Sequence, residues 1–256
     1  MSGGNMKFGK LMGAAVTAAA MMIAAPVQAA TYIITYTGHV SSGYDRTGVF
    51  GTPDRDLSGS AYTSKYFLTF PTLGAYYSSA VPAVLTYGGS QVGLPSPLTG
   101  SLTINGVTKS IAGNYFSKTY QTNGLPNPQY GYDVLYSDVE DYFYNGNYII
   151  QYMVYNEIYS LNNDIISNAD FTKKFSYNFQ PGDSRLGGFM FANWTNSPNL
   201  INEYANGILN PDSYTISAVG AVPEPATWAL MIVGFGAIGS AMRRRQRPVR
   251  AGLSLT

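Results

Sequence analysis

Short runs of β-branched and aromatic residues recur through the middle of the chain, separated by turn-forming residues. Residues 32–37 combine Tyr, Ile and Thr, and polar and apolar positions alternate over residues 61–70. Asn105-Gly106 and Asn145-Gly146 each lie between two such runs, and Asn-Gly is typical of hairpin turns. Further strands are predicted at residues 102–104, 107–111, 142–144, 148–155, 175–179, 187–191 and 213–219. The pattern predicts an all-β body, an antiparallel β-sandwich of jelly-roll type with roughly eight to ten strands. A weak helical indication covers residues 156–171, although its Asn-rich stretches fit a loop or a single turn equally well.

The start of the chain has the pattern of a secretory signal peptide. Lys7 and Lys10 precede an apolar run over residues 11–25, and small residues at Val27 and Ala29 suit cleavage before Ala30. We therefore predict that residues 1–29 form a signal helix that is removed on export. The β-sandwich body is then expected to span residues 30–221.

The end of the chain combines an extended junction, an apolar run and a basic cluster. Two prolines hold the junction extended, and the apolar run over residues 226–242 is at the short end of the span length of about 17–25 residues. A tryptophan near its start suits a membrane interface, and the basic cluster suits the cytoplasmic side. The residues concerned are Pro223, Glu224, Pro225, Trp228, Ala229, Arg243, Arg244 and Arg245. These features predict a transmembrane helix at about 226–242 followed by a basic tail over residues 243–250.

This ordered combination, over residues 222–247, resembles the PEP-CTERM sorting signal in its PEPxxWA variant. The resemblance implies that an exosortase-type membrane protease recognises Pro223, Glu224 and Pro225 and removes the helix at the surface of a Gram-negative cell that makes extracellular polysaccharide. These three residues would then be recognition residues for a processing enzyme. Residues 36–51 also resemble the opening block of a functionally uncharacterised group of such exported proteins, which implies no activity.

Composition excludes several classes of protein. The chain has no cysteine and one histidine, which excludes disulfide scaffolds, thiol nucleophiles and multi-histidine zinc sites. Residues 30–221 carry 8 basic and 13 acidic residues, a net charge of −5 that argues against nucleic-acid binding. The 22 tyrosines of the chain all lie in this body. Tyrosine suits contact with neutral polar polymers, although its preference for strands explains the enrichment equally well.

Few residues are candidates for chemistry. His39 is the single imidazole base, and with no Gly-x-Ser-x-Gly motif we expect a solvent-facing strand histidine. Asp138 could act with Glu140 or Asp141 on a glycosidic bond, or all three could form a solvated acidic loop. The other candidates are Asp45, Asp54 and Asp56 for a structural calcium ion, and Trp194 for sugar stacking or core packing.

These observations favour a non-enzymatic, exported cell-surface or extracellular-matrix protein associated with extracellular polysaccharide and biofilm. No catalytic residue and no cofactor is expected, apart from the calcium ion. The expected partners are the exosortase and the polysaccharide, with membrane insertion before processing and a final place at the cell surface, in the outer envelope or outside the cell. Two alternatives remain open: a polysaccharide-acting glycoside hydrolase or lyase, and an adhesin-like surface protein that binds another protein.

Overall fold

The computed structural model describes residues 30–80, 82–124, 131–195, 201–219 and 235 of the 256-residue chain. The predicted signal helix lies outside these residues, and so does the predicted transmembrane helix apart from residue 235. Within the described ranges no helix is long and apolar enough to cross a membrane. The body is all-β, as the sequence predicts, with one short 3-10 helix, η1, at Ser90–Val92. Its strands are β1 (Ala30–Asp45), β2 (Arg55–Asp56), β3 (Ala61–Phe70), β4 (Tyr76–Ser78), β5 (Ala83–Gly88), β6 (Leu98–Ile104), β7 (Val107–Ile111), β8 (Phe116–Thr122), β9 (Asp133–Tyr144), β10 (Tyr148–Ser160), β11 (Phe175–Asn178), β12 (Asp183–Thr195) and β13 (Ile201–Val219).

The predicted hairpin turns are present. β6 and β7 join through Asn105 and Gly106, both with positive φ, as a tight two-residue turn requires. β9 and β10 join through a longer turn that contains Gly146, since Tyr144 pairs with Ile149. The weak helical indication over residues 156–171 is wrong. That stretch is strand to the end of β10 and irregular chain afterwards.

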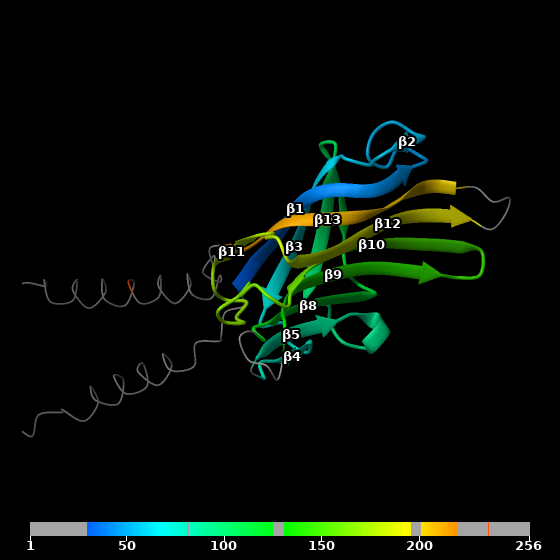
Figure 1. Cartoon of the computed structure of the whole chain (residues 1–256). Helices are drawn as coiled ribbons and strands as arrows, with labels where there is room; N and C mark the ends of the chain where they lie inside the picture. Colours follow the sequence, from blue (N-terminus) through cyan, green and yellow to red (C-terminus); the bar gives the residue numbers. More distant parts are fainter. Residues whose placement is uncertain (1–29, 81, 125–130, 196–200, 220–234, 236–256) are drawn as a thin grey trace, which may run out of the picture. The chain divides into compact units, whose positions relative to one another are not determined.

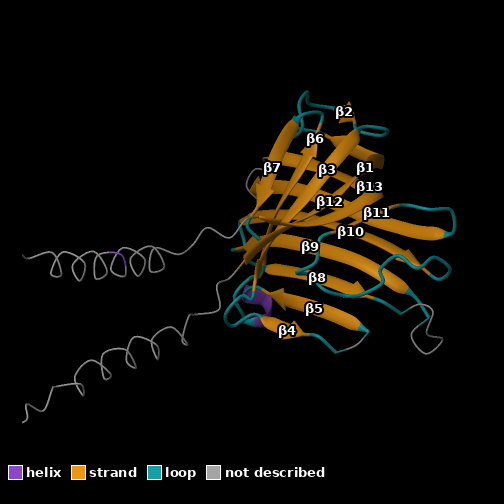
Figure 2. Cartoon of the chain, turned by 90° about the vertical axis from the view of Figure 1, so that its left-hand side faces the viewer, coloured by secondary structure: helices purple, strands orange, loops and turns teal. Residues whose placement is uncertain are grey.

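The strands form one continuous antiparallel sheet, whereas the sequence predicts the two separate sheets of a jelly-roll sandwich. The order across the sheet is β4-β5-β8-β9-β10-β12-β13-β1-β3-β6-β7, with β11 paired to β13 and β2 to β1. The register shifts twice between β1 and β13 and once between β12 and β13. Such bulges bend and twist strands, so a single sheet can curl until one half faces the other. Figure 2 shows β3, β6 and β7 crossing the direction of β8, β9 and β10.

The inward face of the curled sheet holds the hydrophobic core. At its centre the rings of Tyr36, Tyr66 and Tyr214 meet edge to face, with centroids 5.9 Å and 5.1 Å from that of Tyr36. All three rings are buried. Burial raises the pKa of each phenol above its usual value, so these tyrosines stay neutral.

A buried amide connects the two halves of the sheet through this core. Asn156 on β10 is fully buried and accepts a hydrogen bond from the Tyr62 hydroxyl at 2.7 Å. Its amide nitrogen donates to the hydroxyls of Ser64 and Tyr66, both at 2.8 Å. All three partners lie on β3, which is four places from β10 in the strand order. The contacts therefore fix how far the sheet curls.

Both ends of the body lie at the same end of the sheet. β1 begins at Ala30 and β13 ends at Val219, and Thr31 pairs with Val219 (Figure 1). The opposite end carries the β9–β10 hairpin and the end of β1. The buried core of the described residues lies within one compact unit, Ala29–Ala221.

Replacing Asn156 by leucine is expected to destabilise the body by about 2–4 kcal/mol, because it leaves buried hydroxyls without partners. Equilibrium urea unfolding of residues 30–221 measures this change. Asn178→Leu, at an exposed position on β11, is the matched control and is expected to unfold at the wild-type midpoint. Equal midpoints for Asn156→Leu and the wild type would show that the amide does not hold the halves together.

Candidate functional site

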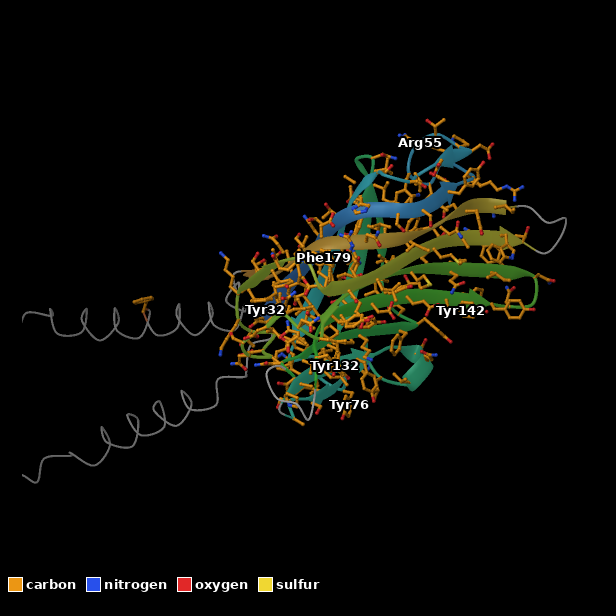
Figure 3. All side chains as sticks on the ribbon, in the orientation of Figure 1. Tyr32, Arg55, Tyr76, Tyr132, Tyr142 and Phe179 are labelled. Atoms are coloured by element: carbon orange, nitrogen blue, oxygen red, sulfur yellow. The ribbon has the colours of Figure 1, made fainter. Side chains whose placement is uncertain are left out.

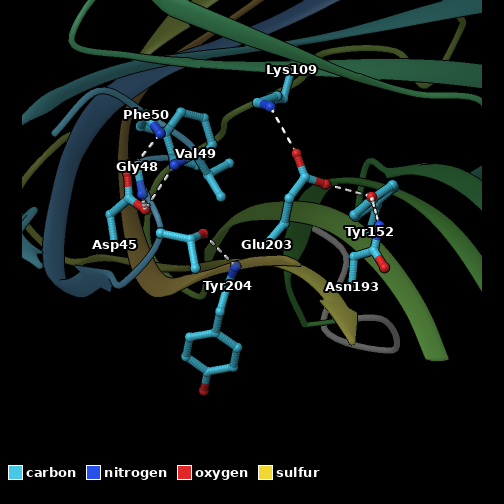
Figure 4. A network of polar contacts seen from close by, with 10 residues as sticks. Asp45, Gly48, Val49, Phe50, Lys109, Tyr152, Asn193, Glu203 and Tyr204 are labelled. Carbon is cyan, nitrogen blue, oxygen red and sulfur yellow. Dashed lines mark hydrogen bonds and ion pairs between the residues drawn. The ribbon is translucent and has the colours of Figure 1, made fainter. Parts of the chain in front are cut away.

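In the first predicted acidic cluster, Asp45, Asp54 and Asp56, the carboxylates accept hydrogen bonds from groups of the protein. Asp45 is fully buried, and its carboxylate accepts hydrogen bonds from the backbone N–H groups of Gly48, Val49 and Phe50 at 2.8, 2.8 and 2.6 Å (Figure 4). The carboxylate therefore holds the loop after β1 in place.

The other two members of this cluster have separate partners. Asp54 accepts from the Tyr44 hydroxyl at 3.1 Å, and Asp56 accepts from the Ser58 backbone N–H at 2.8 Å. Among the residues that the structure describes, no group of three or more acidic or histidine side chains is arranged to hold a metal ion. The loop is organised by backbone donors around Asp45.

The second acidic cluster divides between the two faces of the sheet. Asp138 and Glu140 share the outward face of β9, as two residues of one strand must when they are two apart. Asp141 lies on the inward side and accepts from the backbone N–H groups of Ala112 and Asn114, both at 2.7 Å. The structure therefore separates Asp141 from the other two.

Asp138 is the carboxyl group with the most unusual environment on the outward face. Burial raises its pKa to about 7, helped by the charge of Glu140 and opposed by the Tyr136 hydroxyl and Lys118. Its Oδ2 accepts from the Tyr136 hydroxyl at 3.2 Å, whereas its Oδ1 is buried without a hydrogen-bond partner. Glu140 accepts from the Gln151 amide at 3.0 Å. A carboxylic acid that is partly protonated at neutral pH can donate a proton.

Glu203 is a site residue that the sequence does not reveal. It lies on β13 and accepts from Lys109 of β7 at 3.1 Å and from the Tyr152 hydroxyl of β10 at 2.5 Å (Figure 4). Partial burial opposes its ionisation, but these two donors hold the pKa of Glu203 below its usual value. The three residues are far apart in sequence, so only the curl of the sheet brings them together. Their arrangement holds the facing halves of the sheet together.

A shallow groove of about 600 Å³ crosses the outward face over β10, β12, β13 and β1. Its lining combines tyrosine, methionine and glycine with serine and asparagine, and Asp56 is the one charged residue among those that line it. The lining residues are Ser42, Gly43, Tyr44, Asp56, Ser58, Met153, Tyr155, Gly188, Phe189, Met190, Asn206, Gly207 and Ile208. The groove adjoins the acidic pair of β9, since Tyr155 pairs with Asp138 and Met153 pairs with Glu140. The sequence contains no contiguous signal for this groove, because its residues come from separate strands.

The two remaining candidate residues of the body are His39 and Trp194. The His39 side chain is 40% exposed, as expected, and its Nδ1 lies 3.1 Å from Asp212, which also pairs with Arg185. Trp194 pairs with Ile149 on β10 and lies outside the buried core. The predicted alternative of core packing for Trp194 is therefore wrong.

The environment of Asp138 predicts a pH dependence of stability. Its pKa is raised in the folded state, so the folded protein binds the proton more tightly than the unfolded chain and loses stability as the pH rises from about 4 to about 7. Asp138→Asn is expected to remove this loss and to stabilise the body by about 2–4 kcal/mol at pH 8 but not at pH 4. Urea unfolding at both pH values tests this, with the exposed Asp164→Asn as control. A stabilisation that is the same at both pH values would contradict a raised pKa.

The predicted sorting residues Pro223, Glu224, Pro225, Trp228, Ala229, Arg243, Arg244 and Arg245 lie outside the described residues, as does Ala29, whereas Ala30 begins β1. No match to the chain was found among curated proteins or among solved structures. Residues 221–246 match the family model of the PEP-CTERM protein-sorting motif. Such a motif indicates an exported protein that is sorted by exosortase and anchored transiently in the membrane. The chain is therefore a PEP-CTERM-containing protein.

Proposed function

We propose that this chain is a cell-surface or extracellular-matrix protein that associates with extracellular polysaccharide in a biofilm and does not act as an enzyme. The observation that carries the proposal is the PEP-CTERM motif at residues 221–246, which follows directly on the β body. Export places the body outside the cytoplasm, where polysaccharide is an abundant neighbour of a surface protein.

The surface of the body supports this proposal. Only 11% of the residues are charged, and several tyrosines are exposed, among them Tyr44 and Tyr142. Tyrosine offers an apolar ring and a hydroxyl, which suits hydroxyl-rich neutral polymers. The carboxylates of Asp45 and Asp141 each accept backbone N–H groups, which leaves them tied to loops.

A binding isotherm of residues 30–221 against the producing host's extracellular polysaccharide tests the proposal. We expect saturable binding without release of new reducing or unsaturated sugar ends, equally with calcium and with chelator, because Asp45 already accepts three backbone donors. Absence of binding in both conditions contradicts the proposal. A loss of binding on chelation would instead indicate a calcium site.

The same assay separates the alternatives. Asp138 and Glu140 share one face beside the groove, and the raised pKa of Asp138 favours a glycoside hydrolase or lyase as the second candidate. Sugar release that is lost in Asp138→Asn while binding persists would establish that candidate in place of the first. Binding to cell-surface material that survives enzymatic removal of glycans would establish the adhesin-like alternative.

The sorting part of the proposal has its own test. Replacing Pro223, Glu224 and Pro225 by alanine is expected to abolish processing by exosortase, so the protein should keep its C-terminal segment. Intact-mass spectrometry of the protein from the producing host measures this, with Ser254→Ala beyond the matched motif as the control. An unchanged mature mass in the triple variant would contradict recognition through these residues.

A further inference from the structure

The outward-face groove contains an aromatic ring in an unusual position. Tyr155 on β10 pairs with Gly188 on β12, and a methyl group placed on Gly188 would lie 2.8 Å from Cε1 and 3.1 Å from Cζ of the Tyr155 ring. The ring therefore occupies the space above Gly188 and lies across the neighbouring strand. Any larger residue at position 188 would push it away. Because glycine has no side chain, the Tyr155 ring can pack directly against the backbone of β12, and the outer face of this ring lines the groove.

A second ring lines the groove on β1. Tyr44 is 43% exposed, and its hydroxyl donates to Asp54 at 3.1 Å, which fixes the end of the side chain. The strand order places β12 and β13 between the strands that carry Tyr155 and Tyr44. Three strand spacings correspond to roughly 14 Å, so the two rings lie too far apart to contact one small molecule and suit a chain of several units.

The other residues that line the groove indicate which class of polymer it can bind. Met190 on β12 and the Asn206 amide on β13 lie between the strands that carry the two rings. Met153 lies on β10 beside Tyr155, and the Ser42 and Ser58 hydroxyls also line the groove. These groups offer apolar contact and uncharged hydrogen bonding, and Asp56 adds one negative charge. No lysine or arginine is among the described residues that line the groove, so a polyanion would find no cationic side chain among them to pair with. An uncharged polysaccharide presents apolar C–H faces for stacking and hydroxyls for the polar groups, so it fits this lining best.

The groove also lies away from the end of the sheet at which the chain enters and leaves. Thr31 pairs with Val219 at that end, and Tyr44 follows Ala30 by fourteen residues along β1, or roughly 45 Å of extended strand. Figure 3 shows Tyr32 and Tyr142 near opposite ends of the sheet. A polymer at the Tyr44 side of the groove would therefore not meet the chain ends at Ala30 and Val219.

We propose that this outward-face groove is the polysaccharide-binding site, that it takes a segment of an uncharged polysaccharide, and that sugar rings stack on Tyr155 and Tyr44. This inference rests on the proposed function and deepens it by naming the surface and the class of polymer. Tyr155 and Tyr44 contact the sugar, and Gly188 is a positioning residue that acts through Tyr155.

The experiment uses polysaccharide purified from the producing host and separated by anion exchange into neutral and acidic fractions. The wild-type body is expected to bind the neutral fraction, and Tyr155→Ala and Tyr44→Ala are each expected to weaken binding about tenfold. Tyr155→Phe keeps the ring and is expected to stay within about threefold of the wild type. Gly188→Ala changes no residue that contacts the sugar, but it displaces the Tyr155 ring, so it should weaken binding as Tyr155→Ala does.

Matched controls come from two tyrosines outside the groove. Tyr76 and Tyr132 are each 43% exposed, the same fraction as Tyr44 (Figure 3), and their alanine variants are expected to bind as the wild type does. Circular dichroism and the urea midpoint of each variant show whether it is folded. If Gly188→Ala does not fold, the pair of tyrosine variants still decides the question.

The outcomes separate this inference from the proposed function. If the wild type binds the neutral fraction and the groove variants bind equally well, the groove is not the site, while polysaccharide association stands. If the wild type binds the acidic fraction alone, the assignment to an uncharged polymer is overturned. If the wild type binds neither fraction, the proposed function fails and this inference fails with it.

Discussion

The buried amide of Asn156 is the contact on which the arrangement of the two halves of the sheet depends. It joins β10 to three hydroxyl groups of β3. These two strands are far apart in the strand order. A buried amide has strict requirements, because each unsatisfied donor or acceptor costs free energy. The curl that satisfies Asn156 also brings Glu203 to Lys109 and Tyr152 on the same inward face. Polar contacts thus specify a closure that apolar packing alone would leave less well defined.

Several acidic residues of the body stabilise its loops by hydrogen bonds to backbone N–H groups. Asp45, Asp133 and Asp141 each accept hydrogen bonds from backbone N–H groups of loops. Carboxylates are strong acceptors for such donors, and the interaction needs no basic side chain nearby. This use is consistent with the low proportion of charged residues.

The outward face of the sheet lies outside the hydrophobic core. There Asp138 lies beside a groove whose tyrosines, methionines and polar uncharged groups come from four strands. The inward face is committed to the core and to the contacts that close the sheet.

Features that depend only on neighbouring residues could be predicted from the sequence. The strands follow from alternating polar and apolar positions, and the hairpin turn follows from Asn105-Gly106. The exposure of His39 and the motif at residues 221–246 also depend on neighbouring residues, so all of these features were predictable. The single curled sheet was not, because the bulges of β1 and the pairing of β1 with β13 depend on residues at opposite ends of the body. The placing of Tyr155 over Gly188 likewise arises only when distant strands meet. Tertiary structure decided these features because register and curl, rather than local preference, set which side chains share a surface.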